Sequence, residues 1–387
     1  MKLTLNVSFF TMMFCVVLIR KSASFTTSRI NTSTIRRGFA IDSRRTFLFQ
    51  KDNVRNQSLA KKFQVSLSAA TEDELDSYQN KNNIDDQLVA FISENGEMKV
   101  TACTIRNIVN DVMLQQNLTP TPADALARSM ACGILLSNGM QQEQTFQLTL
   151  QCDGPIRSVM CITNGKGETR GHVGNPGLAD MHISEAIGRG SVQVVKMHPS
   201  WPTPYNGITA IEHGDVDRDV GIYLAESEQR ACALAAASKY SGILCTAAGG
   251  YIVEQLPGCS KETAMKVEEN LAKLTEADGS NTLPAGLLLS GKTPLDICRI
   301  ALDGLGMTPL QNTEPKLVCD CNEDRLFRAI SLLPREEVDK ILAEEEKIEA
   351  RCHFCGKVYR MGPEAVKARL DNVTGDPALD EDFYKYN

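Results

Sequence analysis

Four cysteines near the C-terminus carry the clearest chemistry in this sequence. Cys319 and Cys321 are separated by one residue, and Cys352 and Cys355 by two. Such close pairs place two thiolates on one tight turn, and zinc prefers four thiolate or imidazole ligands in a tetrahedron. The four cysteines are therefore predicted to bind one zinc ion. An iron–sulfur cluster, which also takes four thiolates, is the second candidate.

The segment that carries these cysteines, residues 316–362, is predicted to be a small domain that depends on its metal. A chain of this length buries too little apolar surface to fold without a staple. Zinc binding supplies about 10–16 kcal/mol in small zinc modules, more than the stability of most such folds. Oxidation of either pair is therefore expected to release the metal and unfold the domain. The simplest alternative is a permanent, purely structural zinc ribbon.

Two helices are predicted between the cysteine pairs, and they set the distance between the two turns. The first has an apolar face that includes Phe327 and Ile330, and Pro334 begins the second. His353 lies inside the Cys-x-x-Cys turn, where side chains usually point away from the metal, so it is not predicted as a ligand. Residues 363–387 are predicted to be a loose acidic tail.

Two other functions are compatible with cysteine pairs of this kind. A thiol–disulfide oxidoreductase would use Cys352 and Cys355, but that chemistry favours a first cysteine at a helix N-terminus. Gly356 and the strand-like Val358–Tyr359 follow the pair instead. A zinc ribbon that binds RNA is disfavoured because the chain has a formal charge of −7 and a pI near 5.4.

The remaining residues show no arrangement typical of an active site. Composition is that of a globular protein, with 42% hydrophobic and 23% charged residues. No Ser/His/Asp arrangement is evident, and the four other histidines show no metal-ligand spacing: His172, His182, His198 and His213. We therefore expect a protein that is not an enzyme and that has no nucleic-acid or membrane partner.

Eight further cysteines are scattered through the chain after its N-terminal region. They lie in apolar runs or strands and show no short paired spacing, which favours buried thiols in a reducing compartment over a disulfide framework. These residues are Cys103, Cys132, Cys152, Cys161, Cys232, Cys245, Cys259 and Cys298.

The N-terminal region has the composition of targeting sequences. Residues 1–24 are predicted to be a signal peptide, with an apolar stretch too short to span a bilayer. Residues 25–70 are rich in Arg, Lys, Ser and Thr and contain no Glu, which is typical of a transit peptide. This order of signals, with Phe25 after the expected cleavage site, predicts import into a secondary plastid. A mitochondrial address is the alternative, and simple secretion comes third.

Residues 84–258 are predicted to form one α+β domain with a largely antiparallel sheet. Helical spacing runs from Ile105 to Met113, and a second helix begins at Thr121-Pro122. Apolar and polar residues alternate over Phe146–Cys152, as in a half-buried strand. Further strands are predicted at Val159–Thr163, Val192–Val195, Ile208–Glu212, Val220–Leu224 and Tyr251–Leu256.

Residues 259–315 are predicted to be a linker of short helices that depend on their neighbours for stability. The first is capped by Ser260 and has Val267, Leu271 and Leu274 on one face. Residues 286–293 match the G-x-x-x-x-G-K-[ST] phosphate-loop pattern. However, the residues before them are turn-like and three leucines would occupy the phosphate cradle, so ATP binding is not predicted.

The stretch Val318–Tyr359, which contains VCDC and CHFCGKVY, closely resembles the C-terminal domain of a redox-regulated bacterial heat-shock chaperone family, the 33-kDa chaperonins. Leu148–Pro176 and Ala247–Gly258 are similar to the core domain of that family. The resemblance covers about residues 84–365, and the cysteine spacing agrees without an insertion.

The resemblance implies a chaperone that holds unfolding proteins without ATP. In that family the reduced, zinc-bound form is inactive. Oxidation pairs neighbouring cysteines, here Cys319 with Cys321 and Cys352 with Cys355, and releases the zinc. The small domain and the linker then unfold, apolar surface binds clients, and the active form tends to dimerise. Leu287–Leu289 and the apolar face of the first linker helix are the expected client-binding surface.

Overall fold

The computed structural model describes residues 85–278, 285–331, 335–344 and 348–373. The predicted signal and transit peptides, residues 1–24 and 25–70, lie outside the described residues. The chain divides into two compact units, with the boundary between Cys319 and Asp320. The larger unit contains the predicted core and linker, and the smaller one, which we call the C-terminal module, begins at Asp320.

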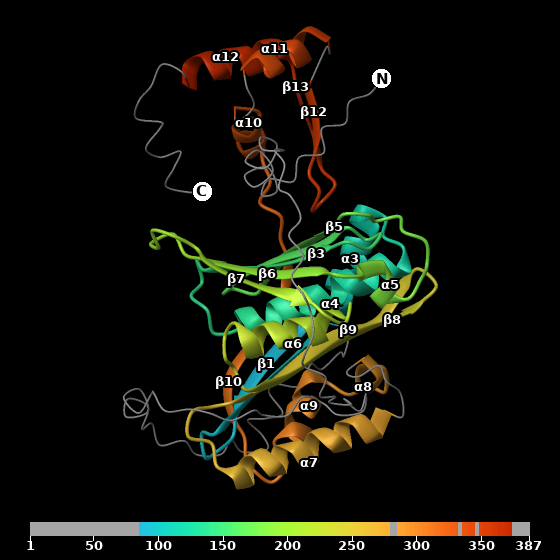
Figure 1. Ribbon diagram of the computed structural model, residues 1–387, viewed down its shortest axis with the longest axis vertical. Helices are drawn as coiled ribbons and strands as arrows, with labels where there is room; N and C mark the ends of the chain where they lie inside the picture. The colour runs from blue at the N-terminus through green and yellow to red at the C-terminus, as the bar shows by residue number, and fades with distance from the viewer. Residues whose placement is uncertain (1–84, 279–284, 332–334, 345–347, 374–387) are drawn as a thin grey trace, which may run out of the picture. The chain divides into compact units, whose positions relative to one another are not determined.

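Two sheets form the framework of the larger unit (Figure 1). The five-stranded sheet has the order β10 (Thr308–Thr313), β1 (Gln87–Ile92), β2 (Met98–Thr104), β9 (Leu244–Gln255), β8 (Cys232–Ser241). The six-stranded sheet has the order β11 (Lys316–Leu317), β5 (Glu168–Val173), β4 (Ser158–Asn164), β3 (Thr145–Cys152), β6 (Gly190–Met197), β7 (Tyr205–Ile211). Among the described strands every pairing is antiparallel except that of β11 with β5. The prediction of an α+β core with a largely antiparallel sheet is confirmed.

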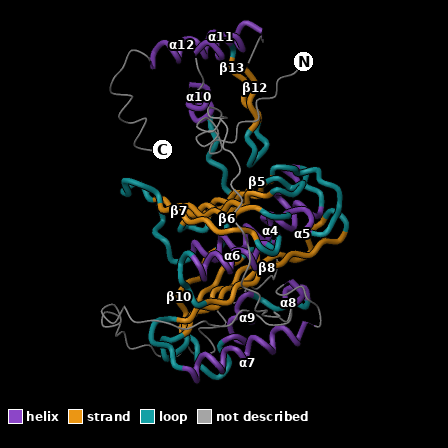
Figure 2. The backbone as a smooth tube through the Cα atoms, viewed as in Figure 1, coloured by secondary structure: helices purple, strands orange, loops and turns teal. Residues whose placement is uncertain are grey.

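Helix α4 (Pro120–Ser137) lies between the two sheets and contacts strands of both (Figure 2). Nearly all of its side chains are buried, because sheets cover opposite sides of it. Leu126, Met130 and Ile134 join the inward faces of the sheets in one hydrophobic cluster. Helices α3 (Arg106–Gln116), α5 (Ile183–Ile187) and α6 (Val216–Glu226) contribute further residues to this cluster.

Helix α3 is capped by a residue from another element. Its own N-cap residue, Ile105, has no side chain that can accept a hydrogen bond. Asp86, just before β1, accepts hydrogen bonds from the backbone amides of Asn107 at 3.0 Å and Ile108 at 2.7 Å. The carboxylate therefore satisfies amides that the first turn of a helix leaves free.

The predicted strand at Val220–Leu224 is wrong, because these residues belong to helix α6. Val216, Val220 and Leu224 recur at intervals of four and are fully buried, so the helical period is present in the sequence. The carboxylate of the buried Asp219 accepts hydrogen bonds from the backbone amides of Glu212, His213 and Asp215, which fixes the turn into the helix. The other predicted strands coincide with β3, β4, β6, β7 and β9.

The linker residues fold against the outer face of the five-stranded sheet. They form α7 (Lys261–Asp278), α8 (Ala285–Leu289) and α9 (Pro294–Ala301). The predicted Ser260 cap is confirmed, since its hydroxyl accepts a hydrogen bond from the Thr263 amide. Val267, Leu271 and Leu274 are buried in a second cluster with residues of β1, β2 and β9. Residues 286–289, within the phosphate-loop match, belong to helix α8, where that motif requires a loop whose backbone amides wrap a phosphate.

The linker ends in a segment that joins the edges of both sheets. Residues 308–317, which we call the strap, form β10 against β1 and then β11 against β5. The amides of Lys316 and Val318 donate to the carbonyls of Gly167 and Thr169, each at 3.0 Å. Only Val318 separates the strap from Cys319.

The C-terminal module has a hydrophobic core of its own. It contains α10 (Glu323–Ser331), α11 (Arg335–Glu344), the hairpin strands β12 (Ile348–Arg351) and β13 (Val358–Met361), and α12 (Pro363–Val373). Its core consists of Phe327, Ile330, Val338, Leu342, Tyr359, Met361 and Val366. The expectation of a loose tail from residue 363 is wrong for α12, because Val366 is fully buried in this core. Residues 374–387 lie outside the described residues.

Candidate metal centre

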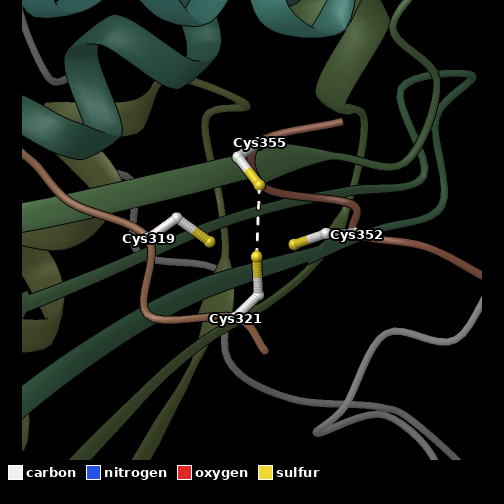
Figure 3. A group of neighbouring side chains, drawn as sticks. All are labelled: Cys319, Cys321, Cys352 and Cys355. Atoms are coloured by element: carbon white, nitrogen blue, oxygen red, sulfur yellow. Dashed lines mark hydrogen bonds between the residues drawn. The ribbon is translucent and has the colours of Figure 1, made fainter. Parts of the chain in front are cut away.

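The structure brings together all four cysteines that the sequence predicts as metal ligands (Figure 3). Their sulfur atoms all lie within 4.8 Å of one another, and Figure 3 shows the four side chains pointing toward a common centre. The sulfurs of Cys321 and Cys355 lie 3.3 Å apart. Each of the four side chains is half-buried.

This donor set fits a tetrahedral metal ion. Zinc binds thiolate sulfur at about 2.3 Å, so four sulfurs around one ion lie about 3.8 Å apart. The sulfurs therefore need to move little from their present positions to hold an ion. Four thiolates are the ligands of structural zinc sites and also of iron–sulfur clusters. His353 stays outside this group of ligands, and burial lowers the pKa of its imidazole.

Cys352 and Cys355 are positioned by the turn of the β12–β13 hairpin. Arg351 pairs with Val358, so the residues between them form the connecting loop. The Cys352 amide donates to the Lys357 carbonyl and the Gly356 amide donates to the Cys352 carbonyl, each at 2.9 Å. Gly356 has φ +71°, a conformation that favours glycine and that closes the turn tightly.

Cys319 and Cys321 lie between the strap and helix α10. On one side the Val318 amide is fixed to β5. On the other side the Asn322 side chain accepts a hydrogen bond from the Arg325 amide at 2.8 Å, which caps α10. Arg325 also forms an ion pair with Asp320 at 2.7 Å. The pair is thus held in a short connection between two regular elements.

Tyr359 is a site residue that sequence reasoning missed. It lies on β13, its ring is in the module core, and its hydroxyl donates to the carbonyl oxygen and the sulfur of Cys321, at 2.8 and 3.1 Å. Because the phenolic proton is shared with Cys321, the pKa of Tyr359 is raised. The ammonium group of Lys357 lies 5.0 Å from the ring centroid. The sequence predicted a strand at Val358–Tyr359, but no local signal indicated the contact with Cys321.

The eight other cysteines have different surroundings. All are free thiols; five are buried, and Cys152, Cys232 and Cys259 are half-buried. Burial raises the pKa of each of the eight, to about 12 for Cys103 and Cys245. Thiols of raised pKa form little thiolate at neutral pH and react slowly with oxidants. Redox chemistry is therefore favoured at the C-terminal four.

The expected client-binding surface is covered in this structure. Val267 and Leu274 are fully buried, and Leu271 and Leu287 are 5% and 3% exposed. The apolar face of the linker therefore packs on the five-stranded sheet and does not face solvent. Within the described part of the chain, no helix is both long enough and apolar enough to cross a bilayer.

Comparison with known proteins identifies the family. The family model described as Hsp33 protein matches residues 86–362. The 33 kDa chaperonin of Thermoanaerobacter sp. strain X514 is 32% identical over 269 residues, covering 66% of this chain and 87% of the relative. That of Caldanaerobacter subterraneus subsp. tengcongensis is 32% identical over 297 residues, covering 74% and 98%. The crystal structure of the 33 kDa chaperonin (Heat shock protein 33 homolog) from Thermotoga maritima has a TM-score of 0.67 at 21% identity, and it covers 75% of this chain and 99% of that one. On the extent of the family match and the identity to these relatives, the chain belongs to the Hsp33 family.

Proposed function

We propose that this protein is a redox-regulated chaperone that binds unfolding proteins without ATP. The observation that carries the proposal is the cluster of four thiols, one in the connection that follows the strap and three in the C-terminal module. Family membership supports it, since the relatives are named chaperonins. The alternatives, an oxidoreductase and an RNA-binding zinc ribbon, have no comparable support.

The four thiolates of Cys319, Cys321, Cys352 and Cys355 would hold one zinc ion in the reduced state. The ion would supply charge neutralisation and a fixed link between the two pairs, and no catalytic step is required of it. The small apolar core of the module supports this role, because a few buried side chains stabilise a fold of this size only weakly. Metal binding and folding of the module are therefore coupled.

Oxidation would switch the protein by converting each neighbouring pair into a disulfide, Cys319 with Cys321 and Cys352 with Cys355. Each bond formed removes two electrons from two thiolates, which a peroxide takes up as it is reduced to water. The module then loses its metal and unfolds, and the strap and linker detach from the sheets of the larger unit. The apolar face at Val267, Leu271 and Leu274 becomes available to unfolding clients, and the exposed surface favours a homodimer.

We also propose that residues 1–70 direct the protein to a plastid through a signal peptide followed by a transit peptide. The composition of the segment supports this proposal. A fusion of residues 1–70 to a fluorescent protein tests it in a cell with secondary plastids. Fluorescence in mitochondria or in the medium would support the alternatives.

The chaperone function is tested by measuring aggregation of a heat-denatured client with two forms of the protein. The reduced, zinc-loaded form is expected to be inactive, and the peroxide-treated form is expected to suppress aggregation as zinc is released. If zinc is released and aggregation is unchanged, the chaperone proposal fails. Catalytic turnover of a disulfide substrate would instead favour the oxidoreductase.

Cys319→Ser and Cys259→Ser form a matched pair for the same experiment. Cys319→Ser removes one thiolate from the cluster and is expected to lose stoichiometric zinc even when reduced. Cys259→Ser changes a half-buried thiol outside the cluster and is expected to keep the metal. Stoichiometric zinc in reduced Cys319→Ser would remove Cys319 from the ligand set.

A further inference from the structure

The hydroxyl of Tyr359 links the hydrophobic core of the module to one sulfur of the metal centre. The Tyr359 side chain is 8% exposed and packs in the module core, and its hydroxyl lies 3.1 Å from the Cys321 sulfur. The same hydroxyl is 2.8 Å from the Cys321 carbonyl oxygen. A single phenolic proton thus serves two acceptors on one residue.

Each of these contacts has a separate physical consequence. The bond to the carbonyl fixes the backbone of Cys321 at the start of the connection to α10. The bond to the sulfur withdraws electron density from a lone pair of the thiolate, and hydrogen bonds to charged acceptors are the strong ones. A thiolate whose lone pair accepts such a bond is a weaker nucleophile, because attack on an oxidant uses that electron density.

We propose that Tyr359 is a positioning residue of the redox switch, which holds Cys321 in the ligand geometry and slows the attack of its sulfur on oxidants. The inference rests on the proposed function, because it assumes that oxidation of these cysteines is the signal. Tyr359 is neither a metal ligand nor a redox-active thiol, but it helps to set the oxidant concentration at which the switch responds.

The affected step is the first one with hydrogen peroxide. The Cys321 thiolate attacks one peroxide oxygen, the O–O bond breaks, and a sulfenic acid forms while hydroxide leaves and takes up a proton to become water. A second thiolate then attacks the sulfenic sulfur, forms the S–S bond and displaces a second hydroxide, which is also protonated to water. The hydrogen bond from Tyr359 must weaken before the first attack, so its removal accelerates that step.

Tyr359→Phe tests the proposal because it removes the hydroxyl and keeps the ring. Met361→Leu is the matched control, since Met361 lies on the same strand, is buried in the same core and has no hydroxyl to donate to a sulfur. Lys357→Gln removes the cation beside the ring and keeps the hydroxyl. All variants are studied as the full chain, reduced and loaded with zinc or, for absorption spectra, with Co²⁺.

Two readouts report on the sulfur itself. The first is the rate at which peroxide modifies Cys321, followed by mass spectrometry of the quenched protein. It is expected to rise about tenfold in Tyr359→Phe, the effect of losing one hydrogen bond to a charged acceptor. The second is the thiolate-to-cobalt charge-transfer band, which is expected to move to lower energy when the sulfur loses the hydrogen bond. A merely structural role for Tyr359 would leave this band unchanged.

The same Cys321 rate and the same cobalt band in wild type and Tyr359→Phe would overturn the inference. If Tyr359→Phe does not fold, 3-fluorotyrosine at position 359 replaces it. This residue is a stronger donor and is expected to slow modification of Cys321; an unchanged or faster rate would also overturn the inference. Neither readout uses a client protein, so a failure of the chaperone proposal in the aggregation assay remains distinguishable.

Discussion

Replacement of Thr293 by alanine would test whether the stability of the linker sets the threshold of the switch. Thr293 caps helix α9 through a reciprocal pair of contacts. Its hydroxyl oxygen accepts from the Asp296 amide at 3.2 Å, and the Asp296 carboxylate accepts from the Thr293 amide at 2.8 Å. Helix α9 has only 8 residues, too few to be stable alone, so it depends on this cap and on its buried face.

The expected size of the effect follows from these contacts. Loss of a threonine N-cap destabilises a helix by about 1 kcal/mol, within a range of about 0.5–2. A change of about 1 kcal/mol raises the population of the detached helix about fivefold. The side chains on its inner face, Leu295, Ile297 and Cys298, are fully buried against the five-stranded sheet and keep the folded form dominant.

Hydrogen exchange measures the opening of helix α9, and client aggregation measures activation of the chaperone. In the reduced, zinc-loaded protein, amides of α9 are expected to exchange about fivefold faster in Thr293→Ala than in wild type. Suppression of aggregation is expected to begin at a lower temperature or after a shorter peroxide treatment. Thr246→Ala is the matched control, because its hydroxyl donates to the Lys239 carbonyl within the β8–β9 hairpin and takes no part in the cap of α9.

Two results would refute the reasoning at different points. Unchanged exchange in α9 would show that the cap contributes little to linker stability. Faster exchange with an unchanged threshold would show that the linker opens without controlling client binding. Faster exchange in Thr246→Ala would mean that the effect is not specific to the cap.

Two further predictions concern the core and the module. Burial raises the pKa of Asp86 from 3.8 to about 6, against the lowering effect of its bonds to the amides of α3. The ionised group therefore destabilises the fold: the penalty is absent below pH 3.8, grows as pH rises, and is complete at about 3 kcal/mol above pH 6. In urea titrations the stability of Asp86→Asn relative to wild type should rise by that amount across this window, and a flat difference would contradict the raised pKa. Val366→Ala, which removes methyl groups from the fully buried face of α12, should destabilise the module by about 2 kcal/mol and weaken zinc binding about thirtyfold in chelator competition. Lys367→Ala changes an exposed residue of the same helix and should leave zinc affinity unchanged. Equal zinc affinities of the two variants would contradict a role of α12 in stabilising the module.

The sequence was most informative about features that are determined by the spacing of neighbouring residues. Close cysteine pairs bring two thiols to one turn, so the cluster of four could be predicted without any knowledge of the fold. Alternation over Phe146–Cys152 predicted β3 for a similar reason, since the side-chain period of a strand is local. The cap at Ser260 is likewise set by neighbouring residues.

Two local predictions failed because one signal was given too much weight. Val220–Leu224 is rich in apolar residues, and this composition predicted a strand although the buried positions recur at helical intervals. The acidic composition after residue 363 predicted a loose tail, but residues 363–373 form helix α12, and its Val366 is buried in the module core.

Other features depend on pairings between distant parts of the chain. Asp86 caps a helix that begins twenty positions later, and Tyr359 meets Cys321 only because the β12–β13 hairpin sets its register. Strand β10 pairs with β1 across more than half of the chain. Side-chain types alone do not specify such partners, because many registers satisfy the same local pattern.

The strap has a consequence for both sheets of the core. Strand β10 covers the outer edge of β1, and β11 covers the outer edge of β5. Uncovered edges present unpaired peptide groups that can add a strand from another chain, the same interaction by which unfolding proteins aggregate. Because one continuous segment covers both edges, its departure would open two templates for extended polypeptides at once. In the proposed chaperone, the strap that covers both edges ends at Leu317, only two residues before Cys319, the first redox-active cysteine.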